Sequence, residues 1–334
     1  SGTNLRLAIS WISSIFGNLF SALFIMKRNF DLIFVFGPSP FTICLPAIFI
    51  KKIKKIPICF WVLDLWPESV YSAGKLKTSM IPKLLLPLVK FTYNNCDRIL
   101  VSSPGFIKSI KEKNIKSKEI DFFPQWAEPL FKKIKNPKNN LTMVPKGSFV
   151  IMFAGNIGEA QDFPSIIKAA NNLKNNKRIQ WVIIGSGRKE KWVKNKIDDL
   201  GLKDVFHMIG RLPLSDMPNY YSQASAMLIS LKREHIFSLT IPAKLQSYLA
   251  CGKPILSMID GSTSELVKTV KAGLTSNSED YNKLSENILK MSQMSVEEIN
   301  QLGENAYNLY LEKFNRNILL SRLETIFYEL IKKD

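Results

Sequence analysis

Short apolar runs alternate with segments of helical periodicity along most of this chain, and that order constrains its fold more than any other feature. The runs are rich in β-branched and aromatic residues, as buried parallel strands are. Strands and helices in alternation build a parallel, doubly wound α/β sheet. In the first third of the chain, the predicted strands are 31–36, 56–62, 98–102 and 119–123, with helices at 41–50, 81–93 and 105–113.

The alternation stops at 132–148, a segment rich in Lys, Pro and Asn that we interpret as a linker, and then restarts. The later predicted strands are 150–153, 180–184, 205–209, 226–229 and 254–258, with helices at 164–170, 189–200, 217–221, 243–250 and 265–271. A closing helical region, 281–333, is long enough to cross back over the first domain. We therefore predict two Rossmann-like parallel-sheet domains facing a cleft, 1–135 and 136–314, with a C-terminal helix, 315–334, packed on the first.

The composition points to an anionic partner and away from metal binding. Lys and Arg outnumber Asp and Glu by 46 to 28, giving a net charge of +18. Nucleic acid, a membrane surface or phosphorylated ligands would each explain that charge, although lysine drift in an AT-rich genome explains part of it. Four dispersed cysteines, no CxxC spacing and only two histidines predict reduced thiols in a cytosolic protein and no metal site.

The most apolar long run, 5–25, is long enough to span a bilayer, but four serines, Gly17 and Asn18 interrupt it. Its apolar residues recur at helical spacing. We expect a helix packed on the domain with part of its face at an anionic membrane surface, although a transmembrane span remains the alternative. The predicted location is cytoplasmic, peripheral at the inner face of the plasma membrane. Because the first domain opens with a helix, its first strand–loop–helix unit is expected to be missing.

Three loops of the second half share a pattern typical of nucleotide sites. After the strand predicted at 150–153, the chain turns at Gly155 and Gly158 and enters a helix, which leaves backbone N–H groups available to an anion. Gly185–Arg188 is a second glycine turn, and 240–248 a third loop. Each loop alone is more often a plain connection. Three together, at the carboxyl ends of strands, favour a nucleotide site.

Lys244 is the main candidate cation of the third loop. Pro242 opens a helix there, whose first N–H groups are free to bind an anion, and Lys244 adds a positive charge in the first turn. The alternative is a solvated lysine.

In the first domain, Asp64 and Glu68 follow a buried strand and stand beside Trp61 and Trp66. Carboxylates in this position commonly reach into a cleft. The alternative is that Asp64 caps a helix and the tryptophans fill the core. Trp126, in an aromatic turn beside the linker, is predicted to line the same cleft.

Six motifs occur in order: DLWPES, PQWAE, FAGNIGEAQDF, GSGR, GRLP and IFSLTIPAKLQSYLACGKPIL. Together they resemble the bacterial family 4 glycosyltransferases of surface-polysaccharide assembly (O-antigen, capsule, exopolysaccharide), in particular the subgroup that includes N-acetyl-L-fucosamine transferases. The resemblance implies a GT-B fold and retaining transfer from a UDP-sugar to a lipid-linked oligosaccharide. It also implies independence from a divalent metal, consistent with the lack of a convincing DxD motif. Family members begin with a strand and a glycine-rich loop facing the acceptor, which the chain is expected to lack.

The resemblance also implies roles for individual residues. Asp64 and Lys244 are the implied catalytic residues, and Trp66, Glu68 and Trp126 lie on the acceptor side. The implied donor-binding residues are Gly155, Asn156, Gly158, Glu159, Gln161, Gly185, Gly187, Arg188, Arg211, Thr240, Ile241, Pro242, Leu245 and Ser247.

The chain departs from the wider family at several of these positions. Asn156 and Gln161 stand where the wider family has Arg and Lys. Ser247 replaces a Glu that holds the ribose, and Leu63, beside Asp64, replaces a His. The pyrophosphate charge is therefore expected to meet Lys244, Arg188 and backbone N–H groups. Two roles stay open for Asp64: to orient the acceptor hydroxyl or to stabilise positive charge on the sugar ring.

Two other functions remain as alternatives. A UDP-sugar 2-epimerase shares the two-domain fold but needs acid–base residues in the cleft. A non-catalytic protein binding membranes or nucleic acid would explain the charge of +18 but not three ordered anion loops. We therefore expect no nucleic-acid partner.

Overall fold

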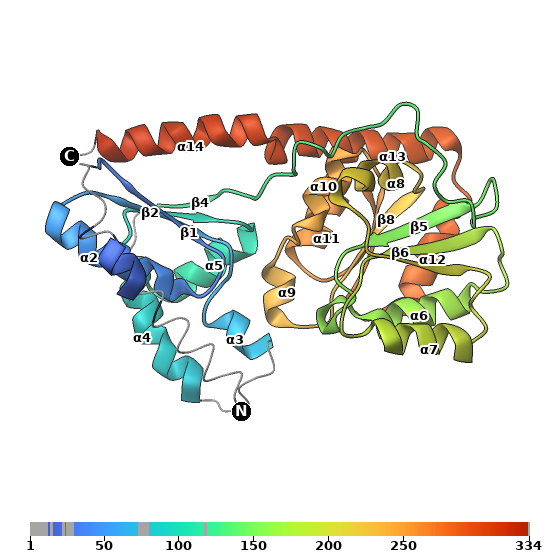
Figure 1. Ribbon diagram of the computed structural model, residues 1–334, viewed down its shortest axis with the longest axis horizontal. Coiled ribbons are helices and arrows are strands. Elements are labelled where there is room, and N and C mark those ends of the chain that lie inside the picture. Colours follow the sequence, from blue (N-terminus) through green and yellow to red (C-terminus); the bar gives the residue numbers. More distant parts are fainter. Residues whose placement is uncertain are drawn as a thin grey trace. The chain divides into compact units, whose positions relative to one another are not determined.

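The computed structural model describes residues 30–72, 80–116 and 119–332, together with residue 13, residues 16–21 and residue 24 (Figure 1). The chain forms two compact units. The first unit contains Ser1–Pro124 and Leu319–Asp334, and the second contains Gln125–Ile318.

The first unit is built on a four-stranded parallel sheet whose spatial order follows the chain. Right-handed crossovers in this order place the connecting helices on one face of the sheet, as Figure 1 shows for α2, α4 and α5. The strands are β1 (Ile33–Gly37), β2 (Ile58–Val62), β3 (Arg98–Val101) and β4 (Ile120–Phe122). The helices are α2 (Cys44–Lys54), α3 (Glu68–Ser72), α4 (Met80–Asn94) and α5 (Pro104–Glu112).

The other face of this sheet receives the C-terminal helix α14 (Arg316–Ile331) (Figure 1). The ring of Phe327 lies 5.2 Å from that of Phe34, centroid to centroid. Arg322 donates a 2.8 Å hydrogen bond to the carbonyl oxygen of Phe122. The predicted return of the chain's end to the first domain is confirmed.

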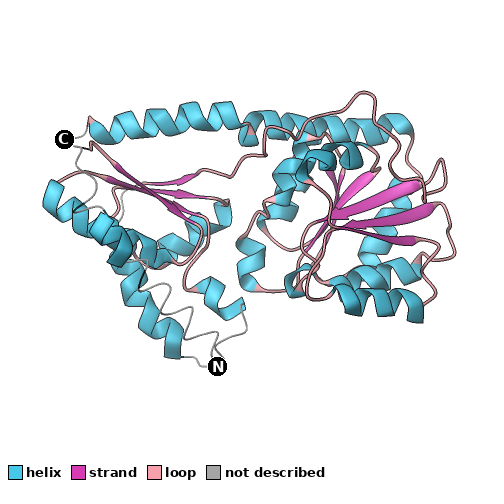
Figure 2. Cartoon of the chain, viewed as in Figure 1, coloured by secondary structure: helices cyan, strands magenta, loops and turns pink. Residues whose placement is uncertain are grey.

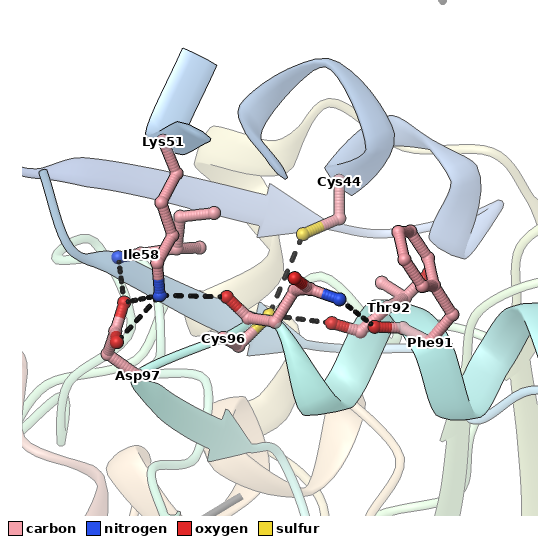
Figure 3. Close-up of polar contacts among 8 residues, drawn as sticks. Cys44, Lys51, Ile58, Phe91, Thr92, Cys96 and Asp97 are labelled. Carbon is pink, nitrogen blue, oxygen red and sulfur yellow. Dashed lines mark hydrogen bonds and ion pairs between the residues drawn. The ribbon is translucent and has the colours of Figure 1, made fainter. Parts of the chain in front are cut away.

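Polar contacts fix α2 against the end of α4 and the start of β3 (Figure 3). Lys51 Nζ lies 2.6 Å from the Asp97 carboxylate, which also accepts a 2.7 Å hydrogen bond from the Ile58 backbone N–H. Cys44 Sγ and Cys96 Sγ are 3.7 Å apart and buried. These contacts set which side of α2 faces the core.

The second unit has a six-stranded parallel sheet with helices on both faces (Figure 2). The strand order is β10-β9-β8-β5-β6-β7. All strands are parallel, but the chain adds β6 and β7 on one side of β5 and β8, β9 and β10 on the other. The strands are β5 (Phe149–Ala154), β6 (Ile179–Ile184), β7 (Phe206–Gly210), β8 (Ala226–Ser230), β9 (Ile255–Met258) and β10 (Gly273–Ser276). Their side chains are largely buried, because both faces are covered.

Helices cover the two faces of this second sheet in sets, as Figure 1 shows. One set is α6 (Phe163–Asn172), α7 (Glu190–Asp199) and α12 (Tyr281–Ser292). The other set includes α8 (Met217–Ser222), α10 (Lys244–Ala250), α11 (Ser262–Thr269) and α13 (Val296–Leu309). The short α9 (His235–Leu239) precedes α10. The predicted parallel α/β architecture is confirmed in both units, but only the second sheet is doubly wound, because the crossovers of the first unit all lie on one face.

The nine predicted strands are present within two residues of their expected limits, but two short α-helices and one strand were not predicted. These are α3, α9 and β10, and none exceeds five residues, too short to show a period. Residues 132–148, predicted as a linker, form no helix or strand. Most of the apolar run 5–25 lies outside the described residues. In the part that is described, no helix combines the length and the apolar character needed to cross a bilayer.

Candidate functional site

A cavity of about 670 Å³ opens where β5, β6 and β7 end. This is the carboxyl edge of an open parallel sheet, where such folds bind ligands. The lining consists of the ends of β5 and β6, the loop after β7 and part of α8: Ala154, Gly155, Asn156, Ile184, Gly185, Ser186, Gly187, Arg211, Leu212, Leu214, Met217 and Tyr221. Five of the predicted donor-binding residues line it. Sequence reasoning missed its apolar wall from α8 and the loop before it.

The first two predicted loops pack directly on each other, and their glycines make this approach feasible. Ile157 N donates a 2.8 Å hydrogen bond to Ser186 O. A Cβ atom on Gly185 would lie 1.9 Å from Gly155 O, and one on Gly187 would lie 2.3 Å from Ile157 O. Gly155 and Gly185 also have φ values of +143° and +135°, which L side chains rarely adopt. This part of the cavity wall is therefore largely backbone.

Lys244, the first residue of α10, extends toward the end of β5. Its Nζ lies 3.9 Å from the centroid of the Phe153 ring and 3.1 Å from the point that a Cβ on Gly155 would occupy. Although part of the residue is exposed, the Nζ is shielded from solvent and has no hydrogen-bond partner among the described residues. Burial lowers the pKa of this amine to about 7. The alternative of a solvated lysine is therefore wrong.

A shielded cation without a counterion is costly, because the face of the Phe153 ring repays only part of the desolvation that a carboxylate or a hydrogen-bond acceptor would offset. Such a group is typical of a place where an anionic ligand completes the pair. Gly155 matters here for a second reason: its missing side chain leaves room for the Lys244 amine on one side, while the residue lines the cavity.

Tyr248 holds α10 against β5 one turn after Lys244. Its hydroxyl accepts a hydrogen bond from Ala154 N and donates one to Ala154 O, both at 3.0 Å. The ladder between β5 and β8 reaches only Met152, so the side of Ala154 that faces β8 has no strand partner there. The Tyr248 hydroxyl satisfies the backbone N–H and carbonyl of Ala154 in place of a strand partner. No sequence pattern had singled out this residue.

Two further cations flank the first loop, and sequence reasoning missed both. Glu159 lies 2.6 Å from Lys189 Nζ and 2.9 Å from Lys232 Nζ. These lysines lower the pKa of the Glu159 carboxyl. Glu159 is thus engaged in surface ion pairs. Arg188, in contrast, is exposed and does not line the cavity.

The other predicted donor residues lie around the site without lining the cavity. The side chains of Ile241 and Leu245 are buried in the core. Thr240 Oγ1 donates to Ile236 O at 2.7 Å. The backbone carbonyls of Pro242, Ser247 and Gln161 accept hydrogen bonds within the second unit. Their donors are Leu245 N, Cys251 N and Ser230 Oγ, respectively. A Cβ on Gly158 would lie 2.4 Å from Asn156 Nδ2.

The predicted residues of the first unit are placed after β2. Asp64 is half-buried and accepts a hydrogen bond from Ser69 Oγ, near the start of α3. Trp66 is buried against the ring of Phe41, with centroids 5.4 Å apart. Trp126 is half-buried and belongs to the second unit.

Glu68 has a structural partner that the sequence did not reveal. Its Oε1 accepts hydrogen bonds from Lys113 Nζ at 2.5 Å and from Ser109 Oγ at 2.7 Å. Lys113 is 8% exposed. Glu68 therefore joins α3 to α5 inside the first unit, which differs from an open acceptor-side carboxylate.

The chain offers few residues for metal or acid–base chemistry. In the described ranges, no group of three His, Cys, Asp or Glu side chains is placed to hold a metal ion. His207 is bonded to Gln180 Oε1 at 2.6 Å, and burial lowers its pKa. All four cysteines fall within these ranges and are buried as free thiols.

Comparison with solved structures confirms the fold. The crystal structure of Anabaena HepE in complex with UDP matches with a TM-score of 0.72 at 13% identity, over 90% of this chain and 79% of HepE. Sucrose-phosphate synthase from Thermosynechococcus elongatus matches with a TM-score of 0.76 at 15% identity, over 92% of this chain and 75% of that one. At this identity the likeness establishes two Rossmann-like parallel-sheet domains, the GT-B architecture.

Comparison with sequences establishes the family. The protein named Probable glycosyltransferase WbjE, of Pseudomonas aeruginosa, is 30% identical over 208 residues, which are 60% of this chain and 51% of WbjE. WcaI of Escherichia coli K12, a proposed glycosyl transferase of colanic acid biosynthesis, is 23% identical over 65% of this chain and 55% of its own. The chain thus spans about half the length of these relatives. The model of the family described as glycosyl transferases group 1 matches residues 135–309, more than half of the chain. The chain belongs to the glycosyl transferases group 1 family.

Proposed function

We propose that this protein is a retaining glycosyltransferase that moves a sugar from a UDP-sugar to a lipid-linked saccharide in surface-polysaccharide assembly. Family membership supports sugar transfer, and the UDP complex of HepE, a protein of the same fold, supports a UDP-linked donor. The proposed role of WcaI in colanic acid biosynthesis supports a polysaccharide product. The resemblance that the six motifs carry together supports an N-acetylated deoxyhexosamine as the transferred sugar.

The observation that carries the donor half of this proposal is the buried, unpartnered amine of Lys244 beside Gly155. In sugar transfer, negative charge grows on the leaving diphosphate while positive charge forms on the sugar ring. A cation already desolvated and fixed at the diphosphate stabilises that charge without reorganisation. The same cation takes the part that a metal plays in other transferases, so the proposed reaction needs no divalent ion.

The acceptor half of the proposal rests on Asp64. It is the carboxylate at the end of β2 in the first unit, with its Oδ1 oriented by the Ser69 hydroxyl. In the proposed reaction it orients the acceptor hydroxyl or offsets positive charge on the sugar ring. Trp126, which is half-buried, is proposed to contribute apolar surface to saccharide binding, whereas Trp66 is buried against Phe41 and is proposed to support the loop that carries Asp64.

The donor proposal is tested by measuring UDP affinity calorimetrically in Lys244→Met and in the parent. A hydrogen bond to a charged group contributes roughly 1.5–3 kcal/mol, so affinity should fall about 10- to 100-fold. Lys290→Met, which alters an exposed lysine at the end of α12, is the matched control and should bind UDP as the parent does. Equal affinity in Lys244→Met and the parent would contradict the proposal.

The transfer reaction is tested with a panel of UDP-sugars and lipid-linked saccharides extracted from membranes, in excess EDTA. The expected product carries the sugar with the donor's anomeric configuration, read by NMR. Loss of activity in EDTA that Mg²⁺ or Mn²⁺ restores would refute the metal-free mechanism. A 2-epimerised free nucleotide sugar would instead identify the epimerase alternative.

A further inference from the structure

Two neighbouring helices of the first unit expose large apolar side chains that the core does not use. On α2, Phe49 and Ile53 are 45% and 55% exposed, and on α4, Leu88 and Phe91 are 37% and 43% exposed. The spacings of four and three residues place each pair on one helix face. We call these four residues the α2/α4 patch. Exposed apolar side chains that cluster on adjoining helix faces are typical of an interaction surface.

The two exposed faces adjoin because α2 is pinned to the end of α4. On its inner side, α2 contributes Cys44 to the contact with Cys96 and Lys51 to the ion pair with Asp97 (Figure 3). On its outer side, Lys52 Nζ lies 5.8 Å from the centroid of the Phe91 ring on α4. The patch therefore continues from α2 to α4, and Lys52 of α2 lies next to Phe91 of α4.

The two helices that carry the patch bear charges of one sign. Segments 41–55 and 80–95 together contain six lysines and no Asp or Glu. One of them, Lys51, is paired with Asp97. Lys52 and Lys55 are exposed beside Phe49 and Ile53. Apolar side chains interleaved with lysines, without any acidic residue, complement a surface that is apolar beneath an anionic layer, which is the chemistry of an anionic lipid bilayer.

A second stretch of the same unit has the same character. Phe16, Phe20 and Phe24 recur every four residues and are all more than half exposed. Their spacing places them on one face of a helix. Exposed phenylalanines are thus not confined to α2 and α4 in this unit.

We infer that the α2/α4 patch docks the first unit on the surface of an anionic lipid bilayer, with Phe49, Ile53 and Phe91 entering the interface and Lys52 and Lys55 meeting lipid phosphates. The surface lies outside the donor cavity and shares no residue with it. The inference therefore does not depend on the donor proposal.

The test is co-sedimentation of the full chain with vesicles of phosphatidylcholine containing phosphatidylglycerol, against vesicles of phosphatidylcholine alone. The parent should bind the anionic vesicles and lose binding as salt rises. The variant Lys52→Glu/Ile53→Glu should reduce the partition coefficient by about tenfold or more. Its matched control is Leu289→Glu/Lys290→Glu, an exposed apolar–lysine pair in the last turn of α12 that makes the same change in net charge.

Three results would overturn the inference: equal binding of patch variant and parent, equal loss in the α12 control, or no preference of the parent for anionic vesicles. Phe91→Ser, which keeps every charge, should also weaken binding, and an unchanged partition coefficient there would contradict the insertion of the aromatic ring. UDP affinity should stay at the parent value in all these variants. Loss of vesicle binding with intact UDP affinity thus separates this surface from the donor site.

Discussion

Each unit contains a lysine whose ammonium group is buried, and the two lysines are treated in opposite ways. In the first unit, Lys113 Nζ contacts Glu68 Oε1 at 2.5 Å, Ser109 Oγ at 2.9 Å and Ser109 O at 3.1 Å. The three N–H groups of this ammonium thus have three acceptors. In the second unit, Lys244 Nζ has no such acceptor in the described part of the chain and faces only the ring of Phe153.

The difference separates a structural cation from a functional one. The buried ion pair of Lys113 with Glu68 ties elements together, and its hydrogen bonds offset part of the cost of desolvation. A buried amine with no partner costs stability, so its retention needs another reason, and ligand binding supplies one. The surroundings of the two lysines agree with this assignment of a structural and a functional role. Lys113 connects α5 to α3, whereas Lys244 stands beside a glycine that lines a cavity.

The largest effect that would sharpen this comparison is expected from Lys113→Met. Removing one member of a buried pair leaves Glu68 uncompensated, which costs roughly 3–5 kcal/mol. The free energy of unfolding, measured in urea, should fall by about that amount. UDP affinity should not change, because the second unit keeps its site.

The matched control is Lys111→Met, which alters an exposed lysine in the last turn of α5, two residues before Lys113. Its free energy of unfolding should stay within about 0.5 kcal/mol of the parent value. If Lys113→Met proved equally mild, the two lysines would not differ in kind, and the comparison would fail.

Much of the fold follows from the sequence because buried parallel strands have a strong local signal. Phe149–Ala154 is a continuous apolar run and Ile179–Ile184 is interrupted only by Gln180, and both form interior strands with every residue buried. The segment Gly273–Ser276 carries a glycine and two hydroxyl residues, so nothing local predicts β10. It forms a strand because β9 offers it an edge, which is a tertiary effect.

The candidate site was predictable in its backbone and less so in its side chains. Gly155, Gly185 and Gly187 were identified as turn residues, which their backbone geometry explains. The pairing of Glu68 with Lys113, 45 residues later, depends on how α3 and α5 pack, and no local pattern contains that information. For the same reason, the sequence marked Lys244 as a cation but could not show that it lacks a partner.

A smaller effect is expected from Tyr248→Phe, which asks how strongly the backbone beside Lys244 depends on one hydroxyl. The change removes the partner of both Ala154 N and Ala154 O, which are buried. Leaving such groups unsatisfied costs about 1–3 kcal/mol. Unfolding measurements should show that loss, and UDP affinity should fall as well, because the end of β5 and α10 then lose their common anchor.

A positioning role for Tyr248 is distinguished from a merely structural one by the binding measurement. If Tyr248→Phe lost stability but bound UDP as the parent does, the hydroxyl would serve the fold alone. Tyr221→Phe is unsuitable as a control because Tyr221 lines the cavity. Tyr328→Phe on the exposed side of α14 is suitable and should change neither quantity.

The smallest effect, and the most specific to the contrast between the two lysines, is the pH dependence of Lys244→Met relative to the parent. Burial holds the pKa of Lys244 at about 7 in the folded protein, against 10.5 for an unperturbed lysine. Between these values the unfolded chain binds one more proton than the folded one, so this group makes the parent more stable as pH rises. Below pH 7 both states are protonated, and the parent carries the full cost of a buried charge. The methionine variant carries none of it. Lys244→Met should therefore be more stable than the parent at pH 7, and its advantage should shrink toward pH 10 by at most about 1.4 kcal/mol per pH unit. The exposed lysines titrate alike in both proteins and cancel in the difference, which is measured by unfolding at several pH values.

UDP binding should raise the pKa of the Lys244 amine again. At pH 8 the amine should take up a proton as the diphosphate binds, and calorimetry in buffers of different ionisation enthalpy counts that proton. A stability difference that stays flat between pH 7 and 10 would mean that the Phe153 ring keeps Lys244 charged, and the two buried lysines would then differ in their partners but not in their charge.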